Sequence, residues 1–192
     1  MNMDDSDLAR GSKEGNLDSF NMLVERHQKT VYNVALRMLG DPSAAEDAAQ
    51  DAFFSAWKNI RSFRGGNFRA WLLCITSNVC RDQLRKRKRH PSISLESLPF
   101  EPKESSSSES PEDYVLRREV RDQIQNGLAN LPSEQRLAVI LCDIQELSYE
   151  EIAQVMKCSP GTVRSRISRG RARLRDYLLK RELLPPGFRL DK

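Results

Sequence analysis

The sequence predicts an all-α protein of two small helical domains joined by a polar linker. Apolar residues recur at helical spacing along most of the 192-residue chain, and no segment shows the period-two alternation of a strand. A stretch over residues 90–111 is rich in serine, proline and glutamate, and it has too few apolar residues to fold alone. We therefore expect domains at 1–89 and 112–182, a flexible acidic linker at 90–111 and a short tail at 183–192.

The charge pattern indicates separate surfaces of opposite sign. The formal net charge is only +4, which permits a polyanionic partner without requiring one. Residues 85–89, RKRKR, form an unbroken cationic run, whereas the segment from Pro91 to Asp113 carries six acidic residues and a single cation, Lys103.

Cysteine spacing argues against a metal centre or a disulfide framework. The four cysteines show no C-x-x-C pair, and the chain has only two histidines, so we expect free thiols, no metal and no cofactor. The acidic, polar start is unlike a signal peptide, and no apolar run approaches the ~20 residues of a membrane helix. These features predict a soluble, cytoplasmic protein that is not itself a membrane protein.

Three helices are expected in the first domain. The first runs from about Phe20 to Met38 and ends at Gly40-Asp41-Pro42. The second ends near Ile60, and a loop over 61–67 precedes the third, over 68–89. In the second domain we expect helices over 112–130 and 134–145, followed by two more that are joined by a tight turn.

This last pair of helices has the pattern of a DNA-binding helix-turn-helix. Ser148 and Glu151 form a capping box at the start of its first helix. Ser159 caps the second helix, and Pro160 follows at the position where a helix tolerates proline. At about 100° per residue, Val163, Ile167, Gly170, Leu174 and Leu178 form the buried stripe of that second helix.

Outside its buried stripe, the second helix carries polar residues with arginines on both sides. A helix in a major groove needs this arrangement, with base-reading residues at the bottom and cations facing the phosphates. Thr162, Ser165 and Arg169 lie opposite the buried stripe, with Arg164, Arg171 and Arg175 on one flank and Arg166 and Arg173 on the other. The alternative is an ordinary solvated charged face, and we favour DNA binding because the flanks are uniformly positive before Asp176.

Two further faces in the first domain could carry function. Asp47, Gln50, Asp51, Phe54 and Lys58 share one helix face, which indicates either a docking surface with an aromatic anchor or a solvated helix with a stray phenylalanine. A catalytic carboxylate pair is a third interpretation, and it lacks supporting histidines or further acids.

The third helix is cationic on one side. Asn78, Arg81 and Arg85 lie there, near an adaptable Gly65-Gly66 loop. Arginines can hold phosphates while aromatic residues stack on unpaired bases, yet for Phe63, Phe68 and Trp71, taken singly, a role in the core is favoured over base stacking.

Taken in order, these segments resemble an extracytoplasmic-function (ECF) bacterial RNA polymerase sigma factor. The resemblance rests on AAEDAAQDAFFSAWKNI (44–60), SFRGGNFRAWLLCITSNVCRDQLRKRKR (62–89), SPEDY (110–114), LPSEQRLAVIL (131–141) and LSYEEIAQVMKCSPGTVRSRISRGRARLR (147–175). It implies a region 2 bundle, a region 4 helix-turn-helix domain and an acidic connector that threads toward the polymerase active-site cleft.

The resemblance also implies a role for each matching position. The residues implied to dock on the β′ coiled coil of core polymerase are Asp47, Gln50, Asp51 and Phe54. Those implied to capture and open the −10 element are Arg61, Phe63, Arg64, Asn67, Phe68, Trp71, Asn78, Arg81 and Arg85, with Asp82 beside them. Those implied to contact the −35 element or its flanks are Tyr149, Glu150, Glu151, Thr162, Arg164, Ser165, Arg166, Ser168, Arg169 and Arg173. Cys142 stands where some members have a basic residue, so one backbone contact is expected to be missing.

The implied partners are core RNA polymerase (β′ and β subunits), promoter DNA and an anti-sigma factor, often membrane-anchored, with no small-molecule substrate. The nearest rival is a two-domain transcriptional regulator that binds duplex operator DNA without polymerase; it would leave the Asp47–Asp51 face and the cationic third helix unexplained. A nucleic-acid enzyme is more distant, because no metal cluster or nucleophile constellation is present in the sequence.

Overall fold

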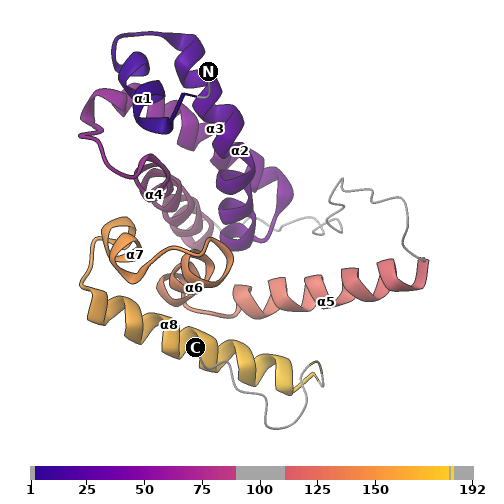
Figure 1. The fold of residues 1–192 in the computed structure, drawn as a ribbon. Helices are drawn as coiled ribbons and strands as arrows, with labels where there is room; N and C mark the ends of the chain where they lie inside the picture. The colour runs from indigo at the N-terminus through magenta and orange to yellow at the C-terminus, as the bar shows by residue number, and fades with distance from the viewer. Residues whose placement is uncertain (1–2, 90–110, 182, 184–192) are drawn as a thin grey trace.

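The computed structural model describes residues 3–89, 111–181 and 183 (Figure 1). Every regular element in these residues is helical, which confirms the predicted all-α class. The predicted linker, apart from Pro111, and nearly all of the predicted tail lie outside the described residues.

The first body comprises residues 3–89. Its helices are α1 (Asp5–Lys13), α2 (Leu17–Leu39), α3 (Pro42–Asn59), the short 3₁₀ helix η1 (Ile60–Ser62) and α4 (Phe68–Arg89). Helices α2, α3 and α4 pack on one another as expected, whereas α1 was not predicted. A signal for α1 exists in the sequence, because Asp4 accepts a hydrogen bond from the Asp7 N–H as an N-cap (2.8 Å).

The break between α2 and α3 follows the predicted signals. Gly40 has φ of 74°, and its N–H donates to the Leu36 carbonyl, so the left-handed cap that favours glycine ends α2. Asp41 then accepts from the Ala44 N–H at 2.7 Å, and Pro42 occupies the first turn of α3.

The second body comprises residues 111–181. Its elements are α5 (Pro111–Ala129), α6 (Ser133–Val139), the π-helical segment η2 (Ile140–Ile144), α7 (Tyr149–Met156) and α8 (Pro160–Leu179). The helix predicted over 134–145 is therefore α6 and η2 in succession. The predicted caps are present: Ser148 and Glu151 form a capping box, and Ser159 accepts from the Thr162 N–H at 3.2 Å.

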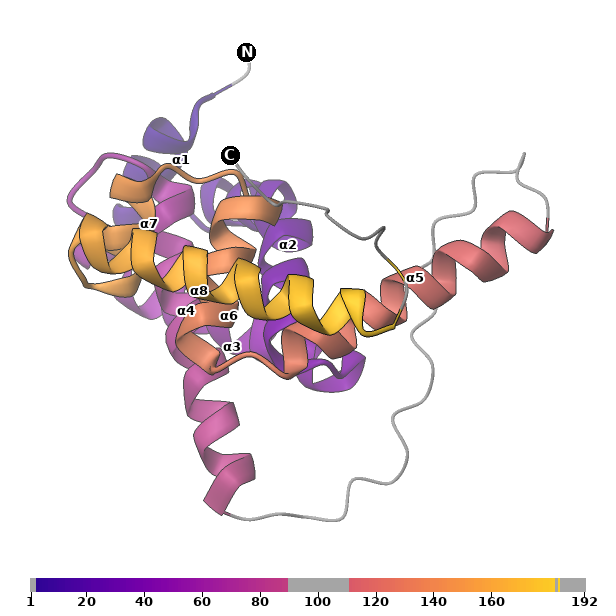
Figure 2. The same ribbon diagram turned by 90° about the horizontal axis from the view of Figure 1, so that it is seen from below.

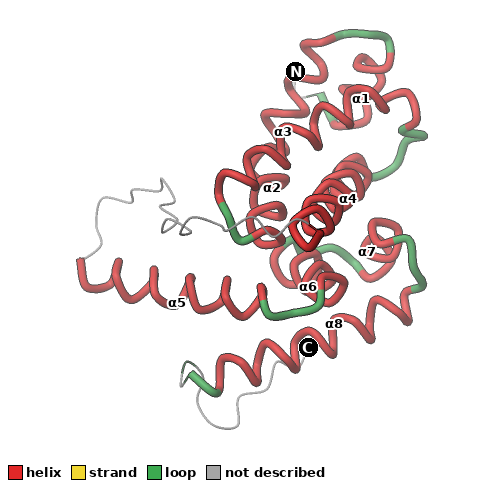
Figure 3. The backbone as a smooth tube through the Cα atoms, turned by 180° about the vertical axis from the view of Figure 1, so that it is seen from behind, coloured by secondary structure: helices red, strands yellow, loops and turns green. Residues whose placement is uncertain are grey.

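The two bodies are packed against each other, which the sequence did not predict. Helices α6 and α7 lie between α4 and α8, while α5 extends away from the rest (Figures 1 and 3). One hydrophobic cluster continues through both bodies and includes Val34 and Leu73 from the first with Ile140 and Ile152 from the second. The view from below shows α8 on the outside of this assembly (Figure 2).

A buried arginine of the second body is hydrogen-bonded to the C-terminal end of α2 in the first body. Arg136 of α6 donates hydrogen bonds to the carbonyls of Met38, Ala129 and Leu131. Burial lowers the pKa of its guanidinium, because the charged form loses hydration. Three carbonyl acceptors replace that water, so a charge without an acidic partner among the described residues is tolerated there.

Candidate nucleic-acid and polymerase interfaces

Helix α3 presents an acidic face with an exposed aromatic ring. Asp47, Gln50 and Asp51 are exposed, and Phe54 is 60% exposed. The Lys58 ammonium lies 4.2 Å from the centre of the Phe54 ring. These four residues, Asp47, Gln50, Asp51 and Phe54, form the docking face, and the structure places them together as the i, i+3, i+4, i+7 spacing predicted.

A groove of about 550 Å³ runs beside the docking face between α2 and α3. Tyr32, Ala49, Gln50 and Phe53 are among the residues that line it. Burial raises the pKa of the Tyr32 phenol, and the nearby carboxylates of Glu46 and Asp41 raise it further. The docking face therefore combines negative charge with an accessible apolar groove, a chemistry suited to a basic helix that has apolar anchors.

In the loop over 61–67, polar side chains are exposed and aromatic ones are buried. Arg61, Arg64 and Asn67 are exposed, as expected for residues that meet DNA. Phe63 and Phe68 are only 3% and 2% exposed, so in this arrangement neither ring is open to a base. They pack edge to face at 5.5 Å, which supports the core role that the sequence left open for them.

Trp71 is half-buried beside these two rings, at 5.4 Å from Phe63 and 5.5 Å from Phe68. A cavity of about 600 Å³ separates the loop from α7, and Trp71 lines it with Arg64 and Asn67. Phe63 also lines this cavity but is only 3% exposed, so Trp71 has the most accessible surface of the three predicted aromatic contacts.

The cationic side of α4 is only partly open. Asn78 and Arg85 are exposed, and Arg85 forms an ion pair with Asp82 at 2.9 Å. Arg81 is half-buried because its Nε lies 3.0 Å from a carboxylate oxygen of Glu134 in the second body. The sequence placed these cations on one side correctly but did not predict that partner.

Helix α8 is seated on α6 by its predicted stripe. Val163, Ile167 and Gly170 are buried, and Leu174 and Leu178 are half-buried. A Cβ at Gly170 would lie 2.7 Å from Val139 Cγ2, so the close approach of the two helices requires glycine.

The outer side of α8 presents the reading face, which we define as Arg164, Ser168, Arg169 and Arg173. All four are exposed, and among the described residues the three arginines have no acidic partner. Thr162 and Ser165 are half-buried beside them, and the Ser165 hydroxyl donates to the Thr162 carbonyl at 2.9 Å.

The flanks of α8 are less positive than its sequence indicates. Arg166 pairs with Glu134 at 3.0 Å, Arg171 with Asp143, and Arg175 with Asp176 at 3.2 Å. Glu134 and Asp143 lie outside α8, so a helical projection of α8 alone could not reveal them. Arg171 also donates to the Cys142 sulfur at 3.7 Å, at the position where the expected basic residue is absent.

The start of α7 faces the first body. Tyr149 and Glu151 are half-buried and Glu150 is exposed. Hydrogen bonding from the Ser148 backbone N–H is the largest influence that lowers the pKa of Glu151, and the Asn67 side chain also donates to this carboxylate. Arg69 donates to the Gln145 carbonyl at 2.9 Å and to its side-chain oxygen at 2.8 Å. Residues of the predicted −10 and −35 surfaces therefore meet where the two bodies pack on each other. We call this contact, made by α6 and α7 with α2 and α4, the joint.

Comparison with known proteins agrees with this architecture. Residues 23–90 match the family described as Sigma-70 region 2, and residues 121–174 match Sigma-70, region 4. The ECF RNA polymerase sigma factor SigW of Bacillus subtilis is 36% identical over 174 residues, covering 86% of this chain and 92% of SigW. The chain belongs to the ECF sigma factors.

Two other relatives of this sigma factor are similar in sequence. The ECF RNA polymerase sigma-E factor of Escherichia coli (strain K12) is 36% identical, covering 87% of this chain and 90% of the relative. The ECF RNA polymerase sigma factor SigE of Mycolicibacterium smegmatis is 39% identical over 85% of this chain, which spans 63% of that relative's length.

Two solved structures resemble the sigma factor as a whole. The sigma factor RpoE of Bartonella quintana, in complex with the anti-sigma factor NepR, gives a TM-score of 0.69 at 28% identity and covers 85% of this chain and 98% of RpoE. CnrH in complex with the cytosolic domain of CnrY gives a TM-score of 0.69 at 29% identity, over 92% of this chain and 99% of CnrH. A regulator that acts without polymerase is accordingly not favoured. None of the helices in the described residues combines the length and apolarity needed to span a membrane.

Proposed function

We propose that this sigma factor carries core RNA polymerase to promoters and helps to open them. The docking face on α3 contacts the β′ subunit, α8 reads the −35 element, and the loop over 61–67 with α4 engages the −10 element. The observation that carries the proposal is that the acidic docking face and the cationic reading face are exposed on different bodies. Both can therefore be occupied at once, by a protein and by DNA.

The step requires no covalent chemistry from the chain, and we infer that the sigma factor is not itself an enzyme. Unpairing DNA costs about 1.4 kcal/mol of stacking per step. Each captured base returns ~1–3 kcal/mol through stacking. A few captured bases, with polymerase contacts to the separated strands, bring opening close to balance.

Regulation by a protein partner is part of the proposal. Both solved relatives above are bound to a second protein, which is named as an anti-sigma factor for RpoE and as the cytosolic domain of CnrY for CnrH. We infer that an anti-sigma factor binds this chain too, in the cytoplasm, where polymerase and promoters are available.

Reconstituted transcription with core polymerase tests the function. Wild-type protein should direct defined starts on a promoter library, and core polymerase alone should not. Asp51→Ala should weaken core binding in a titration because it removes a charge from the docking face. Glu25→Ala, at an exposed acid of α2, is the matched control and should bind core normally. Unaltered core affinity for Asp51→Ala would contradict the docking assignment, and tight operator binding by the chain without polymerase would contradict the function.

A further inference from the structure

Helix α1 is anchored firmly enough to hold other parts of the first body in place. Leu8, Ala9 and Ser12 are almost completely buried, and the helix packs on α2, η1 and α4. It therefore contacts both elements that flank the loop over 61–67.

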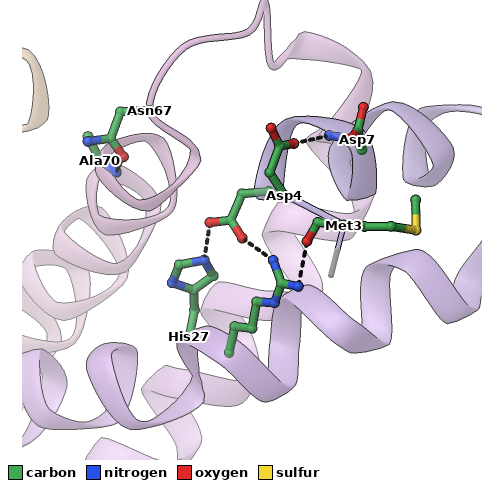
Figure 4. A network of polar contacts seen from close by, with 8 residues as sticks. Met3, Asp4, Asp7, His27, Asn67 and Ala70 are labelled. Carbon is green, nitrogen blue, oxygen red and sulfur yellow. Dashed lines mark hydrogen bonds and ion pairs between the residues drawn. The ribbon is translucent and has the colours of Figure 1, made fainter. Parts of the chain in front are cut away.

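One end of α1 reaches the start of α4 through a histidine. The Asp5 carboxylate lies 2.6 Å from His27 Nε2 and 3.0 Å from Arg26 Nη1. Arg26 also donates to the Met3 carbonyl at 2.6 Å (Figure 4). The His27 ring, in turn, lies 5.6 Å from the ring of Phe68, the first residue of α4. Asp5 thus fixes the orientation of the His27 ring, which packs against Phe68 at the end of the loop over 61–67.

The other end of α1 reaches the start of the loop. The Lys13 ammonium lies 5.4 Å from the centre of the Phe63 ring. Between Phe63 and Phe68, Gly65 and Gly66 have φ of 96° and 88°, and a Cβ added to either would meet no atom within 4 Å. Gly65 and Gly66 therefore add no side-chain contacts, and the loop is held at its ends, by Phe63 and Phe68 and by the hydrogen bonds of Asn67 to Ala70 and Glu151.

We propose that α1 is a brace for the promoter-opening loop, in which Asp5 and His27 are positioning residues. This rests on the proposed function, since the loop is the part assigned to the −10 element. Loss of the brace leaves the aromatic ends able to shift, so a bound base is captured less often. Docking on polymerase and −35 reading involve other surfaces and are retained.

Open-complex formation by holoenzyme tests the brace. Asp5→Asn removes the charge shared by His27 and Arg26, and we expect opening of a duplex promoter to slow by about tenfold. Asp5→Glu should restore most of the rate. Asp7→Asn is the matched control, because Asp7 occupies the same turn and, among the described residues, its carboxylate pairs only with Arg10, at 3.3 Å on the surface.

A promoter that is already unpaired at the −10 element separates positioning from general damage. The Asp5→Asn defect should shrink on this template, since the energetic demand on the loop is smaller. Wild-type opening rates for Asp5→Asn, or an equal defect on both templates, would overturn the brace. Failure of the wild-type protein on both templates would instead refute the proposed function.

A second and independent observation concerns the joint between the bodies. The two carboxylate oxygens of Glu134 contact two arginines: Oε1 lies 3.0 Å from Arg81 Nε, and Oε2 lies 3.0 Å from Arg166 Nη1. One arginine belongs to the α4 side assigned to the −10 element, and the other to the α8 helix assigned to the −35 element. A carboxylate and a phosphate offer a guanidinium the same kind of acceptor.

The closed joint is incompatible with simultaneous contact to both promoter elements. The −10 and −35 elements are numbered by their position on the promoter, so they lie about 25 base pairs apart. At ~3.4 Å per base pair this is a separation of ~85 Å. The bodies meanwhile share one hydrophobic cluster, and Asn67 and Arg69 are bonded to Glu151 and Gln145. The bodies must separate before the proposed promoter complex forms.

We infer that Glu134 is a latch that holds the free chain closed by occupying arginines that DNA would otherwise contact. This inference also rests on the proposed function. Its test uses the full chain without polymerase, a single-stranded −10 oligonucleotide, and the radius of gyration from solution scattering.

Glu134→Gln should raise oligonucleotide affinity about fivefold and increase the radius of gyration. Glu134→Lys, which places a third cation beside the two arginines, should do so more strongly. Glu119→Gln and Glu119→Lys, at an exposed acid of α5, are the charge-matched controls. If affinity and size match those of the corresponding Glu119 variants while holoenzyme transcription is normal, the latch is wrong and the function stands. If wild-type holoenzyme does not initiate, the function is wrong.

Discussion

Helices α4 and α8 both carry arginines that the proposed function assigns to promoter DNA, yet the fold exposes the two sets to different extents. On α8, Arg164, Arg169 and Arg173 are exposed, and the arginines with acidic partners lie on the flanks. On α4, Arg69 and Arg81 are already bonded to the second body. The reading face is open in the free chain, and the −10 surface is partly covered.

The difference follows from which side of each helix meets the joint. Helix α8 packs inward through an apolar stripe, so its polar side is turned outward. Helix α4 contacts α7 and is therefore covered on the side where the second body sits. Under the proposed function, reading of duplex DNA by α8 would therefore depend less on separation of the two bodies than capture of unpaired bases beside α4.

The largest expected effect comes from breaking the core that the two bodies share. Ile140 is fully buried in the common cluster, and Ile140→Ala should lower the free energy of unfolding by about 2–5 kcal/mol. Urea denaturation followed by circular dichroism measures it. Ile144→Ala, in the same segment but 42% exposed, is the control and should stay within about 0.5 kcal/mol. A pair of separate transitions, with only one shifted, would show that the bodies are stabilised independently.

The open reading face is tested by Arg169→Ala. We expect a loss of ~1–3 kcal/mol in discrimination at one position of the −35 element, because a base contact is removed. Promoter competition with variant −35 sequences measures it. Arg175→Ala, whose guanidinium already pairs with Asp176, should leave the sequence preference unchanged. An identical base preference in the Arg169 variant would place sequence reading elsewhere.

The seating of α8 on α6 is tested at Gly170. A new methyl group would meet Val139 at 2.7 Å and the Gln135 carbonyl at 3.2 Å. Gly170→Ala should therefore destabilise the fold by about 1 kcal/mol, since overpacking outweighs the gain in helix propensity. In Gly161→Ala the nearest atom would be 3.9 Å away, so thermal melting should show no loss. Increased stability of the Gly170 variant would contradict the close approach.

The smallest effect is expected at the contact between α7 and the loop. The pKa of Glu151 lies below its usual value of 4.5, so the ionised form stabilises the fold at neutral pH, and this contribution is lost as pH falls through the lowered pKa. Glu151→Gln should reduce Tm by about 2 °C at pH 7. The difference from wild type should vanish in acid. A constant difference across the whole pH series would exclude the charge as its cause.

The sequence predicts the helices well because their signals are local. The Gly40 cap, the Ser148–Glu151 box and the buried stripe of α8 each depend on a few adjacent residues. The ion pairs of Arg81 and Arg166 do not depend on adjacent residues, because their shared partner Glu134 reaches them only when the two bodies are packed together.

For aromatic residues too, local sequence patterns do not report contacts that form only when helices pack. Phe54 and Phe68 both lie on amphipathic helices, but one is exposed and the other buried. Burial of Phe68 depends on packing with His27 and Phe63, which helical spacing does not report. Helix α1, which completes this packing, is polar at its start, and its two buried apolar residues are too few to stand out.

Arg136 gives the joint a property that its surface ion pairs lack. Glu134 is partly exposed, so its attraction to Arg81 and Arg166 weakens as ionic strength rises. The Arg136 guanidinium is buried and bonded to carbonyl dipoles of both bodies, where mobile counterions do not reach it. A rise in the salt concentration of the surroundings would thus weaken the Glu134 contacts between the bodies and leave the Arg136 hydrogen bonds in place.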